Sequence, residues 1–357
     1  MSIRLRRFFA VFYLHEIIGI AVSLVAAAGF FALSSRLDQM QGQAGFHWSI
    51  LRMVMDYYSG FALKASLVGG GALAVAWLMG RWLPQLRHRL QEGHLWQAIG
   101  SLARFALPLL AVLSLYRTMN FFISVLNPND KDAMLAAIDR VLFFGHNPSY
   151  LLENLVTPVL TRYLYTVYVA WFPLVFVTIL ILFLRGHRRT LAQFLLAMLL
   201  TFYTGYVSYL FVPAVGPLYA MPFHIDLNGG TLGAFTNSLT HDYGIARDVF
   251  PSLHTAITLV MLWAVWRAER ALRWPAAILA GSILFSTMYL RFHYVIDVLA
   301  GILLALATTW LAPRFNDAWE RRRGRWREAL GRHLACPPTS MVTASDQAPI
   351  AASRPFG

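Results

Sequence analysis

The chain has 357 residues, of which 58% are hydrophobic and only 13% are charged. About a quarter of the residues in a soluble domain are charged, so this composition excludes an ordinary soluble enzyme and indicates a polytopic membrane protein. The net charge of +13 reflects arginines that flank apolar runs, where such residues set topology and meet anionic lipid headgroups. We therefore expect no nucleic-acid partner. The single cysteine, Cys336, excludes a disulfide framework and a cysteine-based metal site.

Apolar runs of about 17–25 residues, long enough to cross the hydrocarbon core of a bilayer, alternate with short polar segments. They predict an all-α membrane helical bundle of about eight transmembrane helices. The first run follows MSIRLRRFF and is longer than the apolar core of a usual signal peptide, so we interpret it as an uncleaved helix, with a cleaved signal peptide as the alternative. The predicted spans are residues 9–33, 60–80, 101–126, 163–184, 191–213, 252–268, 274–291 and 293–312.

The arginines cluster at both chain ends and in alternate loops, which together hold 20 of the 30 Lys and Arg residues. By the positive-inside rule, both termini are then cytoplasmic. Three loops, about 34–59, 127–162 and 214–251, and a tight turn at Arg291 face outward. We expect a multi-pass protein of the bacterial inner membrane.

The chain divides into three predicted parts. Residues 1–138 form an N-terminal extension of about three spans, and 139–313 form a catalytic membrane domain of about five. Residues 314–357 are Arg-rich and then rich in Pro, Ser and Ala, which predicts a disordered cytoplasmic tail. In the outward loops, DRVLFFGHNPSYLLENLVTP is amphipathic and suits the membrane surface. Two loop histidines, His224 and His241, are candidate headgroup contacts, although loop histidines often have no special role.

The segment FPSLH opens the sixth predicted span. Pro251 suits the first position of a helix, and the N–H groups of Ser252, Leu253 and His254 would then lie unpaired at a helix N-terminus, which favours anions. The Ser252 hydroxyl adds a donor, and His254 titrates near neutral pH. A simple helix cap followed by an interfacial histidine is the alternative interpretation.

A second polar cluster, in YLRFHYVIDVLAG, places Arg291, His293 and Asp297 at the outer start of the eighth span. His293 and Asp297 are four residues apart and share a helical face. A carboxylate on one ring nitrogen fixes the tautomer and leaves the other nitrogen as a nucleophile. The alternative is a structural pair between helices. Both polar clusters fall on the outward side, and together they describe a phosphate site.

FPSLH and YLRFHYVIDVLAG resemble the second and third signature motifs of the PAP2 phosphatase superfamily. The chain is most similar to the branch with the Aur-type inositol phosphorylceramide synthases, a likeness that covers about 139–312. It includes the run from DRVLFFGHNPSY to VYVAWFPL, and PAVGPLYA stands in the usual place of the first motif.

The resemblance implies roles for individual residues. His293 would be the nucleophile that forms a phosphohistidine, and Asp297 would orient it. His254 would protonate the leaving oxygen and later activate the acceptor. Ser252 and the N–H group of Leu253 would hold phosphate oxygens. No metal or other cofactor is implied, because arginine and helix N–H groups supply positive charge.

The chain departs from the family pattern in three places. The usual Lys-x6-Arg-Pro first motif is absent, Ser-Leu-His replaces Ser-Gly-His, and Thr287 stands where the third motif has an arginine. Arg291 is the first candidate to replace the missing phosphate ligands, and Arg247 is the second.

The expected function is cleavage or transfer of the phosphate ester of a membrane lipid, either a phospholipid or a polyprenyl phosphate. Water as acceptor gives a phosphatase, and a polyol or lipid alcohol gives a phosphotransferase; inositol-phosphate or phosphosphingolipid transfer is included. The alternatives are a transporter that relays protons through its histidines and Asp297 and a non-catalytic scaffold. The sequence does not indicate an oligomeric state.

Overall fold

The computed structural model describes residues 6, 9–41, single positions between 48 and 126, and then 127–234, 236 and 247–335. The regular elements in these parts of the chain are all helices, and the predicted all-α membrane bundle is confirmed. They are α2 (Leu14–Gln41), α6 (Asp132–Leu142), α7 (Pro148–Leu151), η1 (Leu152–Leu155), α8 (Pro158–Leu184), α9 (Arg188–Phe211), α10 (Pro217–Ala220), α12 (Leu253–Ala268), η2 (Arg270–Leu272), α13 (Arg273–Tyr289) and α14 (Val295–Ala335).

Five helical segments among the described residues are long and apolar enough to cross a membrane, and the protein is an integral membrane protein. A sixth apolar helix, α12, is shorter. These six helices correspond to six of the eight predicted spans. Predicted span 60–80 lies outside the described residues, and only single positions of 101–126 are described, so the count of eight stays a prediction. The five segments are Leu14–Arg36, Pro158–Leu184, Arg188–Phe211, Arg270–Tyr289 and Val295–Leu330.

The helix boundaries follow from local sequence. Helix α8 begins where the Thr157 hydroxyl accepts the Leu160 N–H at 3.3 Å, with Pro158 at its first position. It ends before Gly186, whose φ of +78° suits a residue without a side chain. The short α7 begins in the same way, with Asn147 as its cap and Pro148 next. These two capped helix starts lie only a few residues apart in the chain, so the amphipathic segment leads directly into α8.

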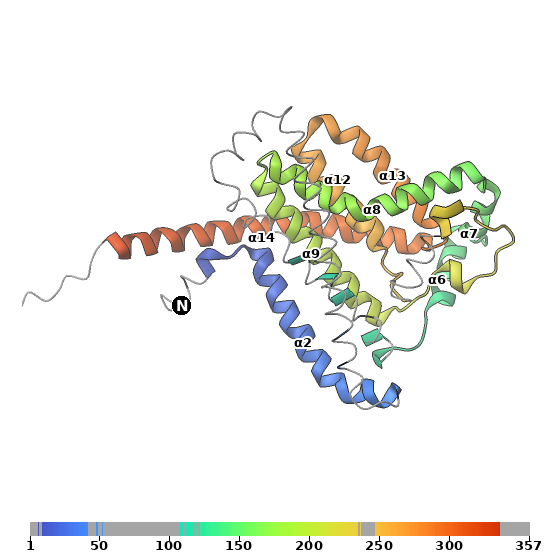
Figure 1. Cartoon of the computed structure of the whole chain (residues 1–357), viewed down its shortest axis with the longest axis horizontal. Coiled ribbons are helices and arrows are strands. Elements are labelled where there is room, and N and C mark those ends of the chain that lie inside the picture. The colour runs from blue at the N-terminus through green and yellow to red at the C-terminus, as the bar shows by residue number, and fades with distance from the viewer. Residues whose placement is uncertain are drawn as a thin grey trace, which may run out of the picture. The chain divides into compact units, whose positions relative to one another are not determined.

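Helix α12 packs against α8, α9 and α13, and Figure 1 shows these four helices grouped together. Its buried positions, which include Ala256, Ile257, Val260 and Ala264, lie on more than one face of the helix, as is usual for a helix that is surrounded by others. Small residues among them let neighbouring helices approach closely, as is usual where helices meet inside a membrane. The start of α12 is therefore held in the middle of a packed bundle.

The chain forms two compact units, residues 13–316 and residues 1–12 with 317–357. In the second unit the Trp319 indole N–H donates to the Phe12 carbonyl at 3.1 Å, and the Arg327 Nε–H donates to the Ala10 carbonyl at 3.0 Å. Phe9 lies edge-on to Trp319 at 6.1 Å. The tail predicted to be disordered from residue 314 is thus helical as far as Ala335, because tryptophans along this helix pack on the N-terminal segment.

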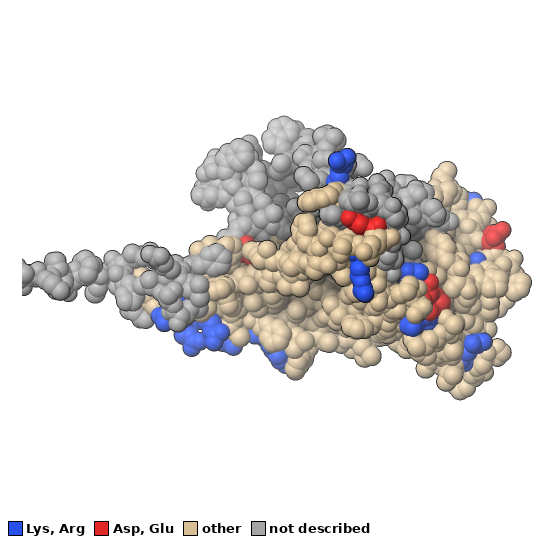
Figure 2. Space-filling model, turned by 90° about the horizontal axis from the view of Figure 1, so that it is seen from below, with Lys and Arg blue, Asp and Glu red and all other residues tan. Residues whose placement is uncertain are grey.

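Helix α14 has 41 residues and is about 60 Å long at 1.5 Å per residue, twice the thickness of a hydrocarbon core. Its later part carries exposed arginines, among them Arg321, Arg322 and Arg325. These arginines follow an apolar section of the helix, which agrees with a section in the membrane and a basic section beyond it. Figure 2 shows a largely uncharged face on which Lys and Arg side chains lie in several places, with Asp and Glu beside some of them.

Candidate active site

The first side of the site is the N-terminus of α12. Ser252 is the N-cap, and its Oγ accepts the Thr255 N–H at 3.3 Å. Pro251 therefore precedes the helix, and its predicted place at the first helical position was wrong. The Ser252 N–H was also predicted to be unpaired, but it donates to the Asp297 carbonyl at 3.0 Å. The N–H groups of Leu253 and His254 belong to the first turn and have no acceptor within the helix.

A glycine brings α14 against this N-terminus. A Cβ atom at Gly301 would lie 2.5 Å from the Ser252 carbonyl oxygen and 3.1 Å from the Thr255 Cβ. Only glycine fits this contact without moving backbone. The contact sets the relative position of the two helices that carry the predicted catalytic residues.

The second side of the site is the turn between α13 and α14. Arg291 adopts a left-handed conformation with φ of +67°, and the Thr287 carbonyl accepts the N–H groups of Phe292 at 3.0 Å and His293 at 3.1 Å. This turn directs His293 toward α12. The rings of His254 and His293 are 5.9 Å apart between centroids, so two histidines from separate motifs meet as the sequence predicts.

His293 and Asp297 are close but are not hydrogen-bonded. His293 Nδ1 lies 3.6 Å from Asp297 Oδ2, beyond the usual 2.7–3.2 Å of such bonds. The same carboxylate oxygen accepts the Tyr294 N–H at 2.8 Å. His293 Nδ1 and Asp297 Oδ1 are buried without a hydrogen-bond partner among the described atoms. Catalytic contacts are often long before substrate binds and shorten in the complex.

A further carboxylate lies near His293 that sequence reasoning missed. Burial raises the pKa of Asp248 to about 6, against the opposing effects of the Tyr116 hydroxyl and His293. Tyr116 donates to Asp248 Oδ2 at 2.8 Å. Burial lowers the pKa of His293 to about 4, while the Asp248 charge and the Val249 carbonyl act to raise it. His293 is therefore neutral near pH 7, as a nucleophile must be.

Aromatic side chains of α8 pack against one side of the histidine pair. Tyr168 stacks on His254 at 4.8 Å and on Phe292 at 4.7 Å between ring centroids, and Trp171 lies 4.4 Å from His254. Tyr168 and Trp171 are buried. The sequence shows aromatic residues along this span but gives no indication of which helix they face.

Both arginines predicted to bind phosphate lie against carboxylates. Arg291 Nη2 is 3.3 Å from Glu153 Oε1 and donates to the Ile225 carbonyl at 2.5 Å, and its guanidinium covers the Phe223 ring at 3.9 Å. Arg247 Nε lies 2.7 Å from Asp130 Oδ1. Their part in phosphate binding stays a prediction, and Arg291 has a structural role in addition.

Glu153 anchors the loop that contains His224 and Ile225. Its Oε1 accepts the N–H groups of His224 at 2.9 Å and Ile225 at 3.0 Å, and Oε2 lies 3.3 Å from His224 Nδ1. Burial favours the protonated form, but the N–H donors, His224 and Arg291 outweigh it and hold the pKa of Glu153 below its usual value. His224 thus has a protein partner, and His241 lies outside the described residues.

Two aspartates of α6, seven residues apart, hold the loops next to the site. Asp132 accepts the N–H groups of Val215 at 3.0 Å and Gly216 at 2.8 Å, and the Tyr294 hydroxyl at 3.0 Å. Gly216 has φ of +89°, and a Cβ there would lie 2.6 Å from the Phe292 carbonyl oxygen.

Asp139 performs a similar task two helical turns further along the same face. It accepts the N–H groups of Val295 and Ile296, each at 2.8 Å, and so caps the start of α14 from another helix. Sequence reasoning missed Asp132 and Asp139, although two buried acids on one face of an amphipathic helix are a usable signal.

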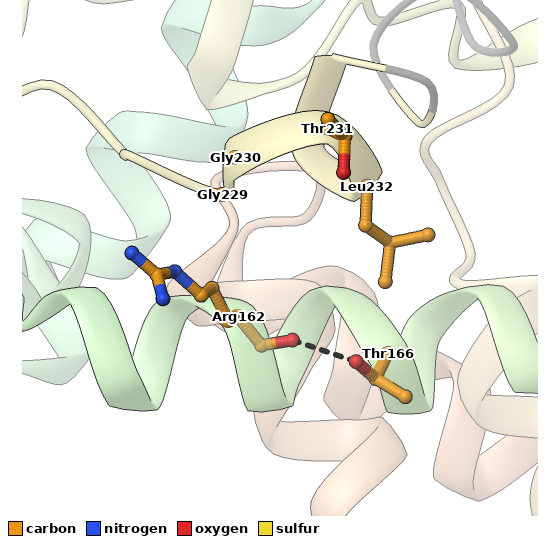
Figure 3. Close-up of a pocket in the computed structure, with 6 residues that line it drawn as sticks. All are labelled: Arg162, Thr166, Gly229, Gly230, Thr231 and Leu232. Carbon is orange, nitrogen blue, oxygen red and sulfur yellow. Dashed lines mark hydrogen bonds between the residues drawn. The ribbon is translucent and has the colours of Figure 1, made fainter.

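An open cavity of about 360 Å³ lies beside the N-terminal turns of α8. Figure 3 shows the segment from Gly229 to Leu232 above this helix, with Arg162 and Thr166 on the helix below. Gly229 is required here, because a Cβ would lie 2.4 Å from the Tyr165 ring. The cavity combines a guanidinium, hydroxyl groups and one apolar side chain, which suits a polar headgroup.

The fold and this pair of histidines define a helical membrane protein with two phosphatase-type motifs at one site. The PAP2 superfamily model matches residues 133–311, half of the chain, and the chain belongs to that superfamily. The matched region begins six residues before the predicted domain boundary at 139. That boundary stays a prediction.

Two curated relatives are inositol phosphorylceramide synthases in name. The phosphoinositol dihydroceramide synthase of Bacteroides thetaiotaomicron is 30% identical over 157 residues, which cover 39% of this chain and 51% of the relative. The inositol phosphorylceramide synthase of Candida albicans is 28% identical over 218 residues, 56% of this chain and 46% of the relative. The predicted family and branch are confirmed. The matches span about half the length of these relatives, and no solved structure matches the chain.

Proposed function

We propose that the protein is an integral-membrane phosphotransferase that moves a phosphate-linked polar headgroup from a donor lipid to an alcohol through a phosphohistidine at His293. The observation that carries this proposal is the meeting of His254, His293 and Asp297 in one buried place, with ring centroids 5.9 Å apart and His293 four residues from its carboxylate. Nucleophile, acid and orienting group are the parts that covalent phosphoryl transfer needs.

In the first half-reaction the neutral His293 attacks the phosphorus of the donor lipid. The bond between phosphorus and the leaving oxygen breaks as the bond to the ring nitrogen forms. His254, which becomes protonated when the anionic phosphate binds beside it, gives its proton to that oxygen. The alcohol part of the donor departs. Asp297 stabilises the positive charge that the His293 ring acquires, as the carboxylate does in other histidine-based sites.

In the second half-reaction an acceptor hydroxyl enters the place of the departed alcohol. His254, now neutral, takes the proton of this hydroxyl as its oxygen attacks phosphorus. The phosphorus–nitrogen bond breaks and returns His293 to its neutral form. The two half-reactions together leave both histidines as they began.

The phosphate oxygens would be held by the first turn of α12. The N–H groups of Leu253 and His254 lack acceptors within the helix, and the helix dipole adds partial positive charge. The Ser252 oxygen already accepts from Thr255, but its own O–H proton is available to a phosphate oxygen. Arg291 and Arg247, each against a carboxylate, stay candidate phosphate ligands. This set of donors needs no metal ion.

Transfer to an alcohol is favoured over hydrolysis by the burial of the site. His293 is 5% exposed, and Tyr168 and Trp171 close the α8 side. A site that excludes water protects a reactive intermediate from hydrolysis. A proton-relay transporter would need a chain of ionisable groups across the membrane, whereas the groups described here converge on one point.

The headgroup would be a polyol such as inositol, the moiety in the names of both relatives. The cavity at Arg162 lies on the N-terminal turns of α8, the same helix that contacts His254 further along through Tyr168. Arg162 and Tyr168 are six residues apart, about 9 Å along a helix. A headgroup could therefore extend from the phosphate toward the cavity.

The proposal is tested with purified protein in lipid nanodiscs that contain phosphatidylinositol and ceramide. Mass spectrometry should detect the inositol-phosphate ester of ceramide with the wild type and none with His293→Ala. Production of inositol phosphate alone would indicate that the protein hydrolyses its substrate as a phosphatase and does not transfer the headgroup. Absence of both products with all donors tried, phosphatidate and polyprenyl phosphate included, would contradict it.

A further inference from the structure

Two buried ring nitrogens without partners among the described atoms belong to adjacent rings. His254 Nε2 and Trp171 Nε1 are fully buried, and neither has a hydrogen-bond partner among the described atoms. Their rings are 4.4 Å apart between centroids, with an angle of 43° between planes. Trp171 as a whole is only 7% exposed. It stands near the middle of α8, which spans residues Pro158–Leu184, at membrane depth.

An indole N–H in such a place is costly unless it has a partner. The group can only donate, and inside a membrane no bulk water is available to accept from it. A phenylalanine would fill the same space without an unsatisfied donor. The ring is also held in place, because Phe172 lies edge-on to it at 5.1 Å and 84°. A fixed, buried donor beside a catalytic histidine points to an acceptor that arrives with the substrate.

We propose that the Trp171 N–H donates a hydrogen bond to a non-bridging oxygen of the phosphate ester bound between His254 and His293. This inference rests on the proposed function and adds a ligand to its site. The first family motif, Lys-x6-Arg-Pro, is absent from this sequence, and both replacement arginines contact carboxylates. Trp171 supplies from α8 one of the phosphate contacts that the missing motif would otherwise provide.

The test uses vanadate, which mimics five-coordinate phosphorus, as inhibitor of the full-length enzyme in nanodiscs. Trp171→Phe keeps an aromatic ring against His254 and removes the N–H. We expect the inhibition constant for vanadate to rise, and kcat/KM to fall, by about 10- to 100-fold, the range for a hydrogen bond to a charged group. The matched control is Trp263→Phe in α12, a partly buried tryptophan that contacts Arg267, which should change neither value.

A second variant separates the N–H from the shape of the ring. Benzothienylalanine at position 171 replaces the N–H with sulfur and keeps the bicyclic outline, so a purely structural role predicts wild-type behaviour. We expect the same loss of vanadate affinity as in Trp171→Phe, with an unchanged thermal midpoint. If Trp171→Phe does not fold, this variant alone tests whether the N–H contributes to vanadate affinity.

The outcomes distinguish this inference from the proposed function. Lipid transfer by the wild type together with equal vanadate affinity in the wild type and the benzothienylalanine variant would overturn the role of Trp171 alone. Absence of transfer and of vanadate inhibition in the wild type would remove the proposed function and this inference with it.

Discussion

Arg291 Nη2 lies 3.3 Å from Glu153 Oε1, and these two side chains, 138 residues apart in sequence, are both more than nine-tenths buried. Through Glu153 the N–H groups of His224 and Ile225 are fixed as well. The pair therefore joins the turn between α13 and α14 to the loop that holds His224 and Ile225. A buried ion pair of this kind matters most when one partner is removed, because the other charge is left without compensation.

Glu153→Gln should inactivate the enzyme as strongly as Arg291→Lys. Removal of one partner of a buried pair costs about 3–5 kcal/mol, and the loop and turn would separate. Activity and thermal unfolding of both variants check this. Glu269→Gln, at the C-terminal end of α12, removes another carboxylate with an ion pair to His187 and should leave activity near wild type. Full activity of Glu153→Gln with an inactive Arg291→Lys would show that Arg291 serves phosphate alone.

Asp248→Asn should remove a rise of kcat/KM near pH 6. Burial raises the pKa of Asp248 to about 6, so this carboxyl is protonated below that pH and negative above it. His293, whose pKa burial lowers to about 4, is already neutral there, and a negative Asp248 would stabilise the positive charge that the His293 ring gains when it attacks. Rates measured from pH 4 to 8 test the sign, and an unchanged rise near pH 6 in Asp248→Asn would contradict it.

Gly301→Ala should lower both activity and stability. The added Cβ would lie 2.5 Å from the Ser252 carbonyl oxygen, which is backbone at the catalytic cap and cannot move without displacing α12. Overpacking of this kind costs about 1–3 kcal/mol. Gly281→Ala in α13 is the matched control, because its Cβ meets nothing within 4 Å. The prediction fails if both variants transfer headgroup at the wild-type rate.

Arg162→Gln should reduce selectivity for a donor with a polyol headgroup. If the cavity beside α8 receives that headgroup, KM for phosphatidylinositol should rise by on the order of tenfold, the effect of one charge-assisted hydrogen bond. Cleavage of phosphatidate, which has no such headgroup, should stay constant. Arg140→Gln, an exposed arginine of α6, is the control. An equal loss of activity on phosphatidylinositol and on phosphatidate would indicate that Arg162 contacts the membrane surface and not the headgroup.

The sequence singled out His254 and His293 as candidate catalytic residues because their signals are local. His293 and Asp297 need only helical spacing, and Ser252 to His254 need only a helix N-terminus. The partners of Arg291 and the aromatic wall at His254 depend on how distant helices pack, which no local pattern contains. The helix position of Pro251 was wrong because Ser252 itself is the N-cap, a residue type that strongly prefers this place.

The fold could be predicted from the sequence about as well as the candidate site. Apolar runs identified the helices that the structure describes, because length and hydropathy are set by the bilayer. The tail was the exception. High arginine content predicted disorder, but Trp319 and Trp326, seven residues apart, meet Phe9 at 6.1 and 6.4 Å. That contact comes from the opposite end of the chain and has no signal in the tail alone.

The central claim is covalent transfer through His293, and trapping of the phosphoenzyme tests it most directly. A donor lipid labelled in the phosphate should label the wild-type protein when acceptor is omitted, and mass spectrometry of the peptides should place the phosphate ester on His293. His254→Ala should still accumulate some label from a donor whose leaving group needs no proton, such as a p-nitrophenyl phosphodiester, and His293→Ala should accumulate none. Label that persists in His293→Ala, or that maps to another residue, would contradict the account.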